Sequence, residues 1–227
     1  MLNDYLRRHD GVITLGQARA AGFSWRAVQR RLQSGEWVRC SRGVYFVDDR
    51  PFSDAARVRA AVWGYGPGAV ASGLTAAWWH ALTRFAPEIA EVTVPRGSHG
   101  RRHPDTRVRR RNLDECDVVE RRGLRVTSLP LTVVEAAAQR GGGPKLMDNA
   151  LQRHVDLNSL WHAPLRNKGR TGAPRSRRLL QAASDGSRSA AERLLIKTLR
   201  DAGITGWKAN YRVAGYRVDV GFPGPRV

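Results

Sequence analysis

The stretch GVITLGQARAAGFSWRAVQRRLQSGEWVRCSRGVYF, residues 11–46, decides the fold of the N-terminal part of the chain. Thr14 and Gln17 have the spacing of a capping box, so they predict the start of a short helix that ends at Gly22. Ser24 is a typical N-cap and predicts a second helix over WRAVQRRLQS. Two short helices separated by a few residues that include glycine are typical of a helix-turn-helix.

A β-hairpin is predicted directly after these two helices. EWVRC and VYFV are short β-prone runs, and the three-residue loop SRG between them ends in glycine. A helix-turn-helix followed by a hairpin is the order of a winged helix. We therefore expect a winged-helix DNA-binding domain over residues 1–50.

The second predicted helix sorts its side chains by face. Val28 and Leu32 are four residues apart and predict a pair that faces the core. The opposite face, at positions i, i+3, i+4 and i+7, holds only long side chains with several hydrogen-bond donors: Arg26, Gln29, Arg30 and Gln33. Arginine can read O6 and N7 of guanine, and glutamine can read N6 and N7 of adenine. An ordinary solvated face mixes acids with bases. This face has no acid, so we expect it to contact bases or phosphates.

Other arginines are candidates for contacts with DNA phosphates. Arg39 and Arg42 lie in the predicted hairpin, with plain surface exposure as the alternative. Residues 96–125 contain ten arginines against five acids, and the predicted strand RVRRRN would present basic side chains on one sheet face. This second surface either contacts DNA or is merely solvated, and its residues are Arg101, Arg102, Arg109, Arg110 and Arg111.

The composition restricts the class of protein. The chain of 227 residues carries 39 lysines and arginines against 20 acids, a net charge of +19. Such an excess indicates a polyanionic partner, most often nucleic acid. An acidic membrane surface and general arginine enrichment are the alternatives. No apolar run approaches the ~18 residues of a membrane-spanning helix, and two cysteines cannot form a disulfide framework. We expect a cytoplasmic, nucleoid-associated protein.

Three further segments follow the predicted winged helix, which makes the fold class α+β. Residues 53–162 form a mixed α/β middle domain, in which GAVASGLTAAWWHAL reads as one helix and EVTVP as a strand. Residues 163–188 hold seven bases and one acid among Gly, Pro and Ser, as in a basic linker around a short helix. Residues 189–227 read as an amphipathic helix and a strand pair.

Two carboxylates in the last segment are candidate catalytic residues. Glu192 lies in the predicted helix, where Ser189 and Glu192 also have the spacing of a capping box. Asp219 lies in a predicted strand, a position where aspartate is disfavoured and usually has a specific role.

These residues resemble a known family. Residues 11–46 are similar to the N-terminal winged helix of AbiEi-family antitoxins of bacterial type IV toxin–antitoxin systems. GAVASGLTAAWWHAL, EVTVP and GLRVTSLPLTVVEAA resemble the segment that follows it in actinobacterial members. The resemblance implies a winged helix that binds operator DNA and represses its own operon, with a downstream toxin as the protein partner.

The C-terminal segment resembles a second family. SAAERLLIKTLRDAG and YRVAGYRVDVGFP are similar to the opening of a very-short-patch-repair-like endonuclease domain, a PD-(D/E)XK fold. In that family a helix glutamate, a strand aspartate and a Glu-x-Lys-like element hold Mg²⁺. Glu192 and Asp219 match the first two positions, but VGFPGPRV after Asp219 offers neither a carboxylate nor a lysine. We therefore expect an incomplete, truncated restriction-endonuclease-like segment that binds no metal.

The sequence thus predicts a sequence-specific DNA-binding protein, an antitoxin or transcriptional autoregulator without a cofactor. The alternative is a metal-dependent endonuclease, or its inactive remnant, that the winged helix delivers to DNA. Mg²⁺ would be required only in that case. A third interpretation is an interaction module that neutralises a toxin by contact.

Overall fold

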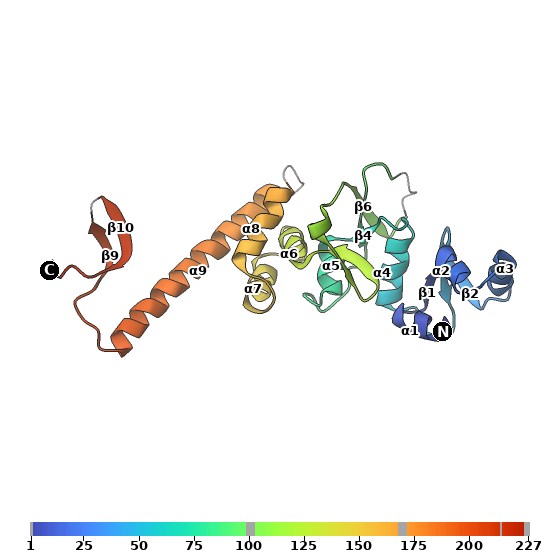
Figure 1. The fold of residues 1–227 in the computed structure, drawn as a ribbon, viewed down its shortest axis with the longest axis horizontal. Coiled ribbons are helices and arrows are strands. Elements are labelled where there is room, and N and C mark those ends of the chain that lie inside the picture. The colour runs from blue at the N-terminus through green and yellow to red at the C-terminus, as the bar shows by residue number, and fades with distance from the viewer. Residues whose placement is uncertain (1, 99–102, 168–171, 214, 225–227) are drawn as a thin grey trace.

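The protein is elongated, with its N-terminal and C-terminal elements at opposite ends (Figure 1). The computed structural model describes residues 2–98, 103–167, 172–213 and 215–224. A first unit at one end leads into a middle unit around a sheet. A helical layer follows, and the long helix α9 runs from it to a C-terminal hairpin (Figure 1).

The first unit has the element order of a winged helix. Its elements are α1 (Leu2–Arg8), β1 (Val12–Thr14), α2 (Leu15–Ala20), α3 (Trp25–Gln33), β2 (Trp37–Ser41) and β3 (Val44–Val47). The strands form an antiparallel sheet in the order β1-β3-β2. Both hydrogen bonds of the predicted capping box are present, because Thr14 Oγ1 accepts from Gln17 N and Gln17 Oε1 accepts from Thr14 N. The predicted helix boundaries in this unit are therefore confirmed.

A mixed five-stranded sheet forms the middle unit, in the order β6-β5-β4-β8-β7. Its strands are β4 (Val70–Ala71), β5 (Ala90–Val94), β6 (Thr106–Arg110), β7 (Val118–Arg121) and β8 (Leu124–Thr127). The pairs β5–β6 and β4–β8 are parallel, and the pairs β4–β5 and β7–β8 are antiparallel. Helix α4 (Asp54–Trp63) and helix α5 (Gly73–Trp79) supply Val58, Val62 and Trp79 to the core on this sheet. Trp79 is 1% exposed and anchors α5 in this core.

The expectation of a single helix over GAVASGLTAAWWHAL was wrong. Val70 and Ala71 form strand β4, and the helix begins only at Gly73. Gly73 has a φ of +56°, and a Cβ atom there would lie 2.0 Å from Oε2 of Glu91. The chain therefore turns sharply between strand and helix, at a position that only glycine fits.

The helical layer follows the sheet along the chain. Its elements are the helices α6 (Leu129–Ala137), α7 (Pro144–Arg153), α8 (Leu157–Arg166) and α9 (Ala173–Asp201), whereas the 3₁₀ turn η1 (Glu115–Asp117) lies earlier, between β6 and β7. The helices share a core of buried residues with α5, which includes Val133, Met147, Leu160 and Leu180. The mixed α+β class is thus observed.

Helix α9 overturns the expectation of a basic linker with a short helix. It has 29 residues, and it runs through the expected border between residues 188 and 189. Pro174 lies in its first turn, where proline is compatible with a helix, and Leu180 anchors it in the helical core. Ser189 lies inside this helix, whose N-cap is Gly172, so Ser189 does not begin a helix as predicted.

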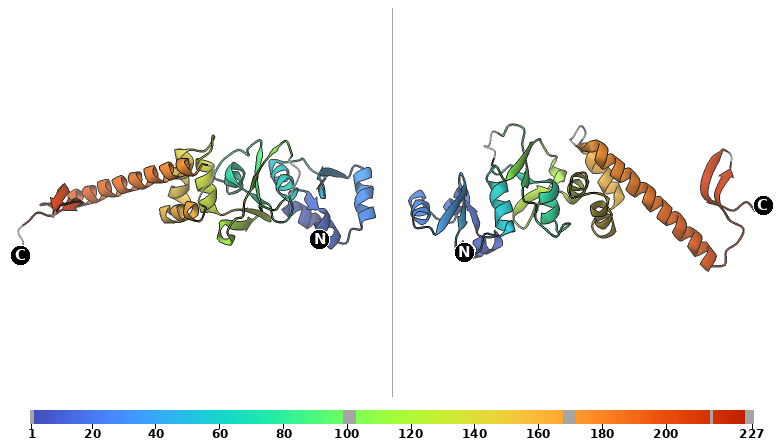
Figure 2. Two further views of the ribbon diagram at one scale, coloured as in Figure 1. Left: turned by 90° about the horizontal axis from the view of Figure 1, so that it is seen from above. Right: turned by 180° about the vertical axis from the view of Figure 1, so that it is seen from behind.

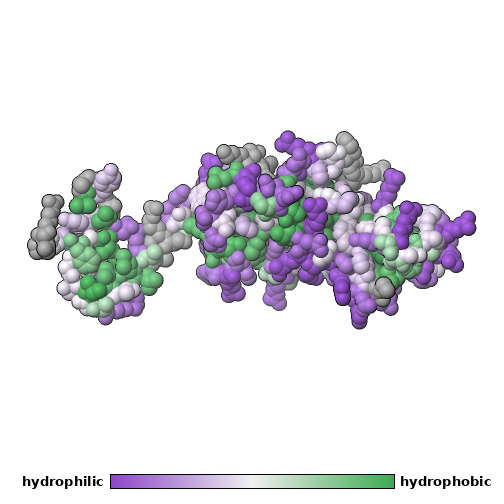
Figure 3. Space-filling model, viewed as in Figure 1, coloured by the Kyte–Doolittle hydropathy of each residue, from purple (hydrophilic) through white to green (hydrophobic). Residues whose placement is uncertain are grey.

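The C-terminal hairpin pairs β9 (Lys208–Val213) with β10 (Tyr216–Gly221). This end of the molecule exposes large apolar side chains in the space-filling view (Figure 3). They are Leu194, Leu195, Ile204, Val213, Tyr216 and Phe222. Among the described residues, no helix is long and apolar enough to cross a membrane.

One buried arginine connects the winged helix to the middle unit. Arg59 of α4 is 0% exposed, and its guanidinium donates to Asp10 Oδ2 over 2.9 and 3.1 Å. It also donates to the carbonyl oxygens of Arg122 and Gly123, between β7 and β8. The guanidinium lies 5.1 Å from the ring centre of Trp63 and 5.2 Å from that of Trp79.

Asp10→Asn should destabilise the whole fold, because it leaves the Arg59 guanidinium buried without a counter-charge. Asp10 has a φ of +54°, which asparagine tolerates, so the substitution adds no backbone strain. We expect urea unfolding to show a loss of about 3 kcal/mol. The matched control Asp4→Asn breaks an exposed pair with Arg7 and should leave stability nearly unchanged. Equal stability of the Asp10→Asn and wild-type proteins would contradict this role for Arg59.

Two histidines should make stability depend on pH. Burial lowers the pKa of His9 and of His80 below the ordinary 6.5. Below that pH the unfolded chain binds protons that the folded chain does not, so the free energy of unfolding should fall as the pH is lowered from 7.5 to about 5.5. In His80→Gln this fall should be smaller. A free energy of unfolding that is constant across this range would show that both histidines titrate normally.

Candidate nucleic-acid interface

Helix α3 is the outermost element at the N-terminal end of the molecule (Figure 2). Ser24 begins it as predicted, with its side chain accepting from Ala27 N at 3.2 Å. Gly35, with a φ of +79°, follows the last turn. The amino-acid sequence therefore sets both ends of this helix locally, through an N-cap and a residue that readily adopts a left-handed conformation.

The inner face of α3 packs on the core of the first unit. Val28 is 0% exposed, and Leu32 packs against the same core. Arg31 also lies on this side, with its guanidinium 4.7 Å from the ring centre of Phe23 and 6.0 Å from that of Trp37. Arg31 therefore stabilises the attachment of α3 to the sheet.

The outer face of α3 is open to solvent. The four residues predicted to contact DNA are all exposed: Arg26, Gln29, Arg30 and Gln33. Their side chains make no hydrogen bond or ion pair with any residue in the described part of the chain. An exposed face of four donor side chains without internal partners can contact the edges of bases or the phosphates of a duplex.

The hairpin of β2 and β3 places two more arginines at the surface. Arg39 and Arg42 are both exposed, and the pairing of β2 with β3 shifts register between Arg39 and Ser41. Glu36 is the one acid in the sequence from residue 15 to residue 47, and it lies 3.8 Å from Arg31 Nε. The surface of α3 and the hairpin is thus strongly basic, which suits phosphate contacts.

The expected second basic surface is not formed as predicted. Strand β6 and the residue after it turn Arg109 and Arg111 inward, toward carboxylates that are themselves buried. Arg111 makes a double ion pair with Glu135, and Arg109 lies 3.4 Å from Glu91. These two arginines hold the middle unit together and are not free for DNA.

The other three members of that expected surface have different positions. Arg110 is exposed and donates to the carbonyl oxygen of Ser98 at 3.1 Å. Arg101 and Arg102 lie outside the described residues.

The candidate nuclease carboxylates lie in the C-terminal elements. Glu192 is half-buried on α9, and Asp219 is exposed on β10. Within the described ranges, no three His, Cys, Asp or Glu side chains are grouped so that they could hold a metal ion. The nuclease interpretation thus gains no support from this geometry.

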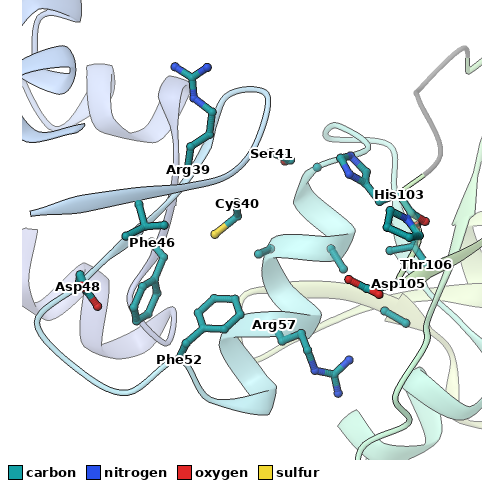
Figure 4. A pocket seen from close by; sticks show the side chains of 16 residues that line it. Arg39, Cys40, Ser41, Phe46, Asp48, Phe52, Arg57, His103, Asp105 and Thr106 are labelled. Carbon is teal, nitrogen blue, oxygen red and sulfur yellow. Dashed lines mark hydrogen bonds between the residues drawn. The ribbon is translucent and has the colours of Figure 1, made fainter. Parts of the chain in front are cut away.

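Sequence reasoning missed a cavity beside the hairpin. It lies between β2–β3, helix α4 and residues 103–106, and its volume is about 550 Å³ (Figure 4). Its walls come from three distant parts of the chain, so no local pattern could have indicated it.

Comparisons with known proteins agree with the class of the first unit. The family model described as "Transcriptional regulator, AbiEi antitoxin" matches residues 1–47. No curated protein matches the chain. Among solved structures, the crystal structure of the RV2827C protein from Mycobacterium tuberculosis is similar, with 17% identity and a TM-score of 0.47. That match covers 78% of this chain and 74% of that chain.

Two neighbouring arginines of α3 should have separable roles. Arg31→Ala removes the contacts with Phe23 and Trp37, so we expect a loss of about 1 kcal/mol in the free energy of unfolding. Arg30→Ala, one position earlier on the outer face, should leave stability unchanged. Urea unfolding of both variants measures this difference. A larger loss of unfolding free energy in Arg30→Ala than in Arg31→Ala would reverse the assignment of the two faces of α3.

Proposed function

We propose that this protein binds DNA sequence-specifically and acts as an antitoxin-like transcriptional autoregulator. Its winged helix would bind an operator in its own promoter, and its protein partner would be the cognate toxin of a type IV toxin–antitoxin-like system. The match of residues 1–47 to AbiEi antitoxin regulators supports the class, and the open face of α3 supports the mechanism.

The observation that carries this proposal is the division of α3 into two faces. Its apolar side chains and Arg31 hold the helix on the core, while Arg26, Gln29, Arg30 and Gln33 face solvent without partners among the residues that the structure describes. In this mechanism, α3 enters the major groove and the outer face reads base edges. Arg39 and Arg42 of the hairpin contact backbone phosphates on one side of the groove.

Base reading by α3 can be tested with Arg30→Ala on a duplex selected from a random pool. We expect about tenfold weaker binding to the preferred duplex and little change on unrelated duplexes. The loss of a base contact lowers the affinity only for duplexes that carry the matching base. Fluorescence anisotropy at fixed salt measures both. Equally weaker binding to all duplexes would instead indicate that Arg30 contacts a phosphate.

The hairpin arginines should affect binding differently. Arg39→Ala combined with Arg42→Ala should weaken binding to all duplexes and make it less dependent on salt. Each phosphate contact adds about 0.9 to the slope of log affinity against log salt, so the slope should fall by about 1.8. Titrations at several salt concentrations give this slope. An unchanged slope would show that the hairpin does not contact phosphates.

A further inference from the structure

The cavity beside the hairpin joins the winged helix to the middle unit. One wall is formed by Val38, Cys40 and Phe46 of the hairpin, and the opposite wall includes Ala60 and Ala61 of α4. At about 550 Å³, the cavity is within the range of sites that bind small molecules. An occupant would therefore contact both units at once.

The cavity offers an apolar and aromatic surface. Phe46 and Phe52 lie edge to face, with ring centres 4.9 Å apart, at one side of the space (Figure 4). Phe52 is 51% exposed, so its ring is accessible to an occupant of the cavity. Burial raises the pKa of the Cys40 thiol to about 11, so this group is neutral at physiological pH. These walls favour a flat aromatic ligand.

Two carboxylates line the cavity, although the protein as a whole is strongly basic. Asp48 and Asp105 are exposed at the cavity and form no ion pair with any residue that the structure describes. The Arg57 guanidinium is occupied by Asp54 and by the carbonyl oxygens of Pro87 and Glu88.

Two other basic residues line the cavity, Arg39 and His103. The side chain of Arg39 points away from the cavity (Figure 4). His103 also lines the space, with its ring 5.8 Å from that of Tyr65 and edge-on to it. Two carboxylates beside an aromatic wall are therefore complementary to a cation.

We propose that this cavity is a binding site for an aromatic organic cation, such as an aryl amidinium. The flat ring system would lie against Phe46 and Phe52, and the cationic group would meet Asp48 or Asp105. An amidinium can donate two parallel hydrogen bonds to one carboxylate, and phenylalanine rings attract cations through their π faces. Neither interaction is available to a neutral molecule of the same shape.

The test is calorimetric titration of the full chain with 2-naphthamidine, without DNA, so its outcome does not depend on the proposed function. The neutral analogue 2-naphthamide has nearly the same shape. We expect saturable binding of the amidine with one site per chain and at least about fivefold weaker binding of the amide.

Variants locate the site. Whichever of Asp48 and Asp105 contacts the amidine, its replacement by asparagine should weaken binding of the amidine about fivefold. Phe52→Ala should weaken binding of both compounds. The matched controls are Glu120→Gln, an exposed carboxylate on β7, and Phe85→Ala, a ring that is 77% exposed elsewhere. Both controls should bind as the wild type does.

Three results would overturn the proposal. One is the absence of saturable binding, and another is equal affinity for amidine and amide. The third is a loss of amidine affinity in Glu120→Gln as large as the losses in both Asp48→Asn and Asp105→Asn. Such a loss would indicate unspecific attraction of the amidine to surface carboxylates.

Discussion

The Arg59–Asp10 ion pair is the constraint on which the arrangement of the two N-terminal units depends. A fully buried guanidinium is costly unless every donor is occupied and a counter-charge is close. Here Asp10 comes from the winged helix, and the carbonyl oxygens of Arg122 and Gly123 come from the middle unit. Separating the units would leave this charge unpaired. The position of the winged helix relative to the middle unit is thereby fixed by electrostatics as well as by apolar packing.

The net charge of +19 is distributed unevenly between structural and surface roles. Arg31, Arg59 and Arg111 all hold the fold together, through aromatic rings or buried carboxylates. The outer face of α3 is different, because its cations have no such partners in the described part of the chain. A basic composition therefore indicates binding to a polyanion only where the arginines do not already pair with carboxylates or aromatic rings of the fold.

Local signals in the sequence were sufficient for the helix-turn-helix and the hairpin of the first unit. Caps at Thr14 and Ser24, a glycine after each helix and the periodicity of α3 predicted α2, α3, the hairpin and the two faces of α3, whereas α1 and β1 were not predicted. Long-range contacts explain the failures. The ion pairs of Arg109 and Arg111 depend on Glu91 and Glu135, which lie elsewhere in the sequence. Leu180 packs the first half of α9 on other helices of the layer, a contact that no local pattern indicates. The cavity, built from three separated segments, had no sequence signal at all.

In the proposed complex, the outer face of α3 meets base edges in the major groove. Dimethyl sulfate footprinting on a selected duplex is a sharp test, since the reagent methylates guanine N7 in that groove. If α3 reads bases, the wild-type protein protects particular guanines, and Arg30→Ala loses protection at one of them while protection at the others remains. Complete reactivity of every guanine in the bound duplex would show that α3 does not read guanines in that groove.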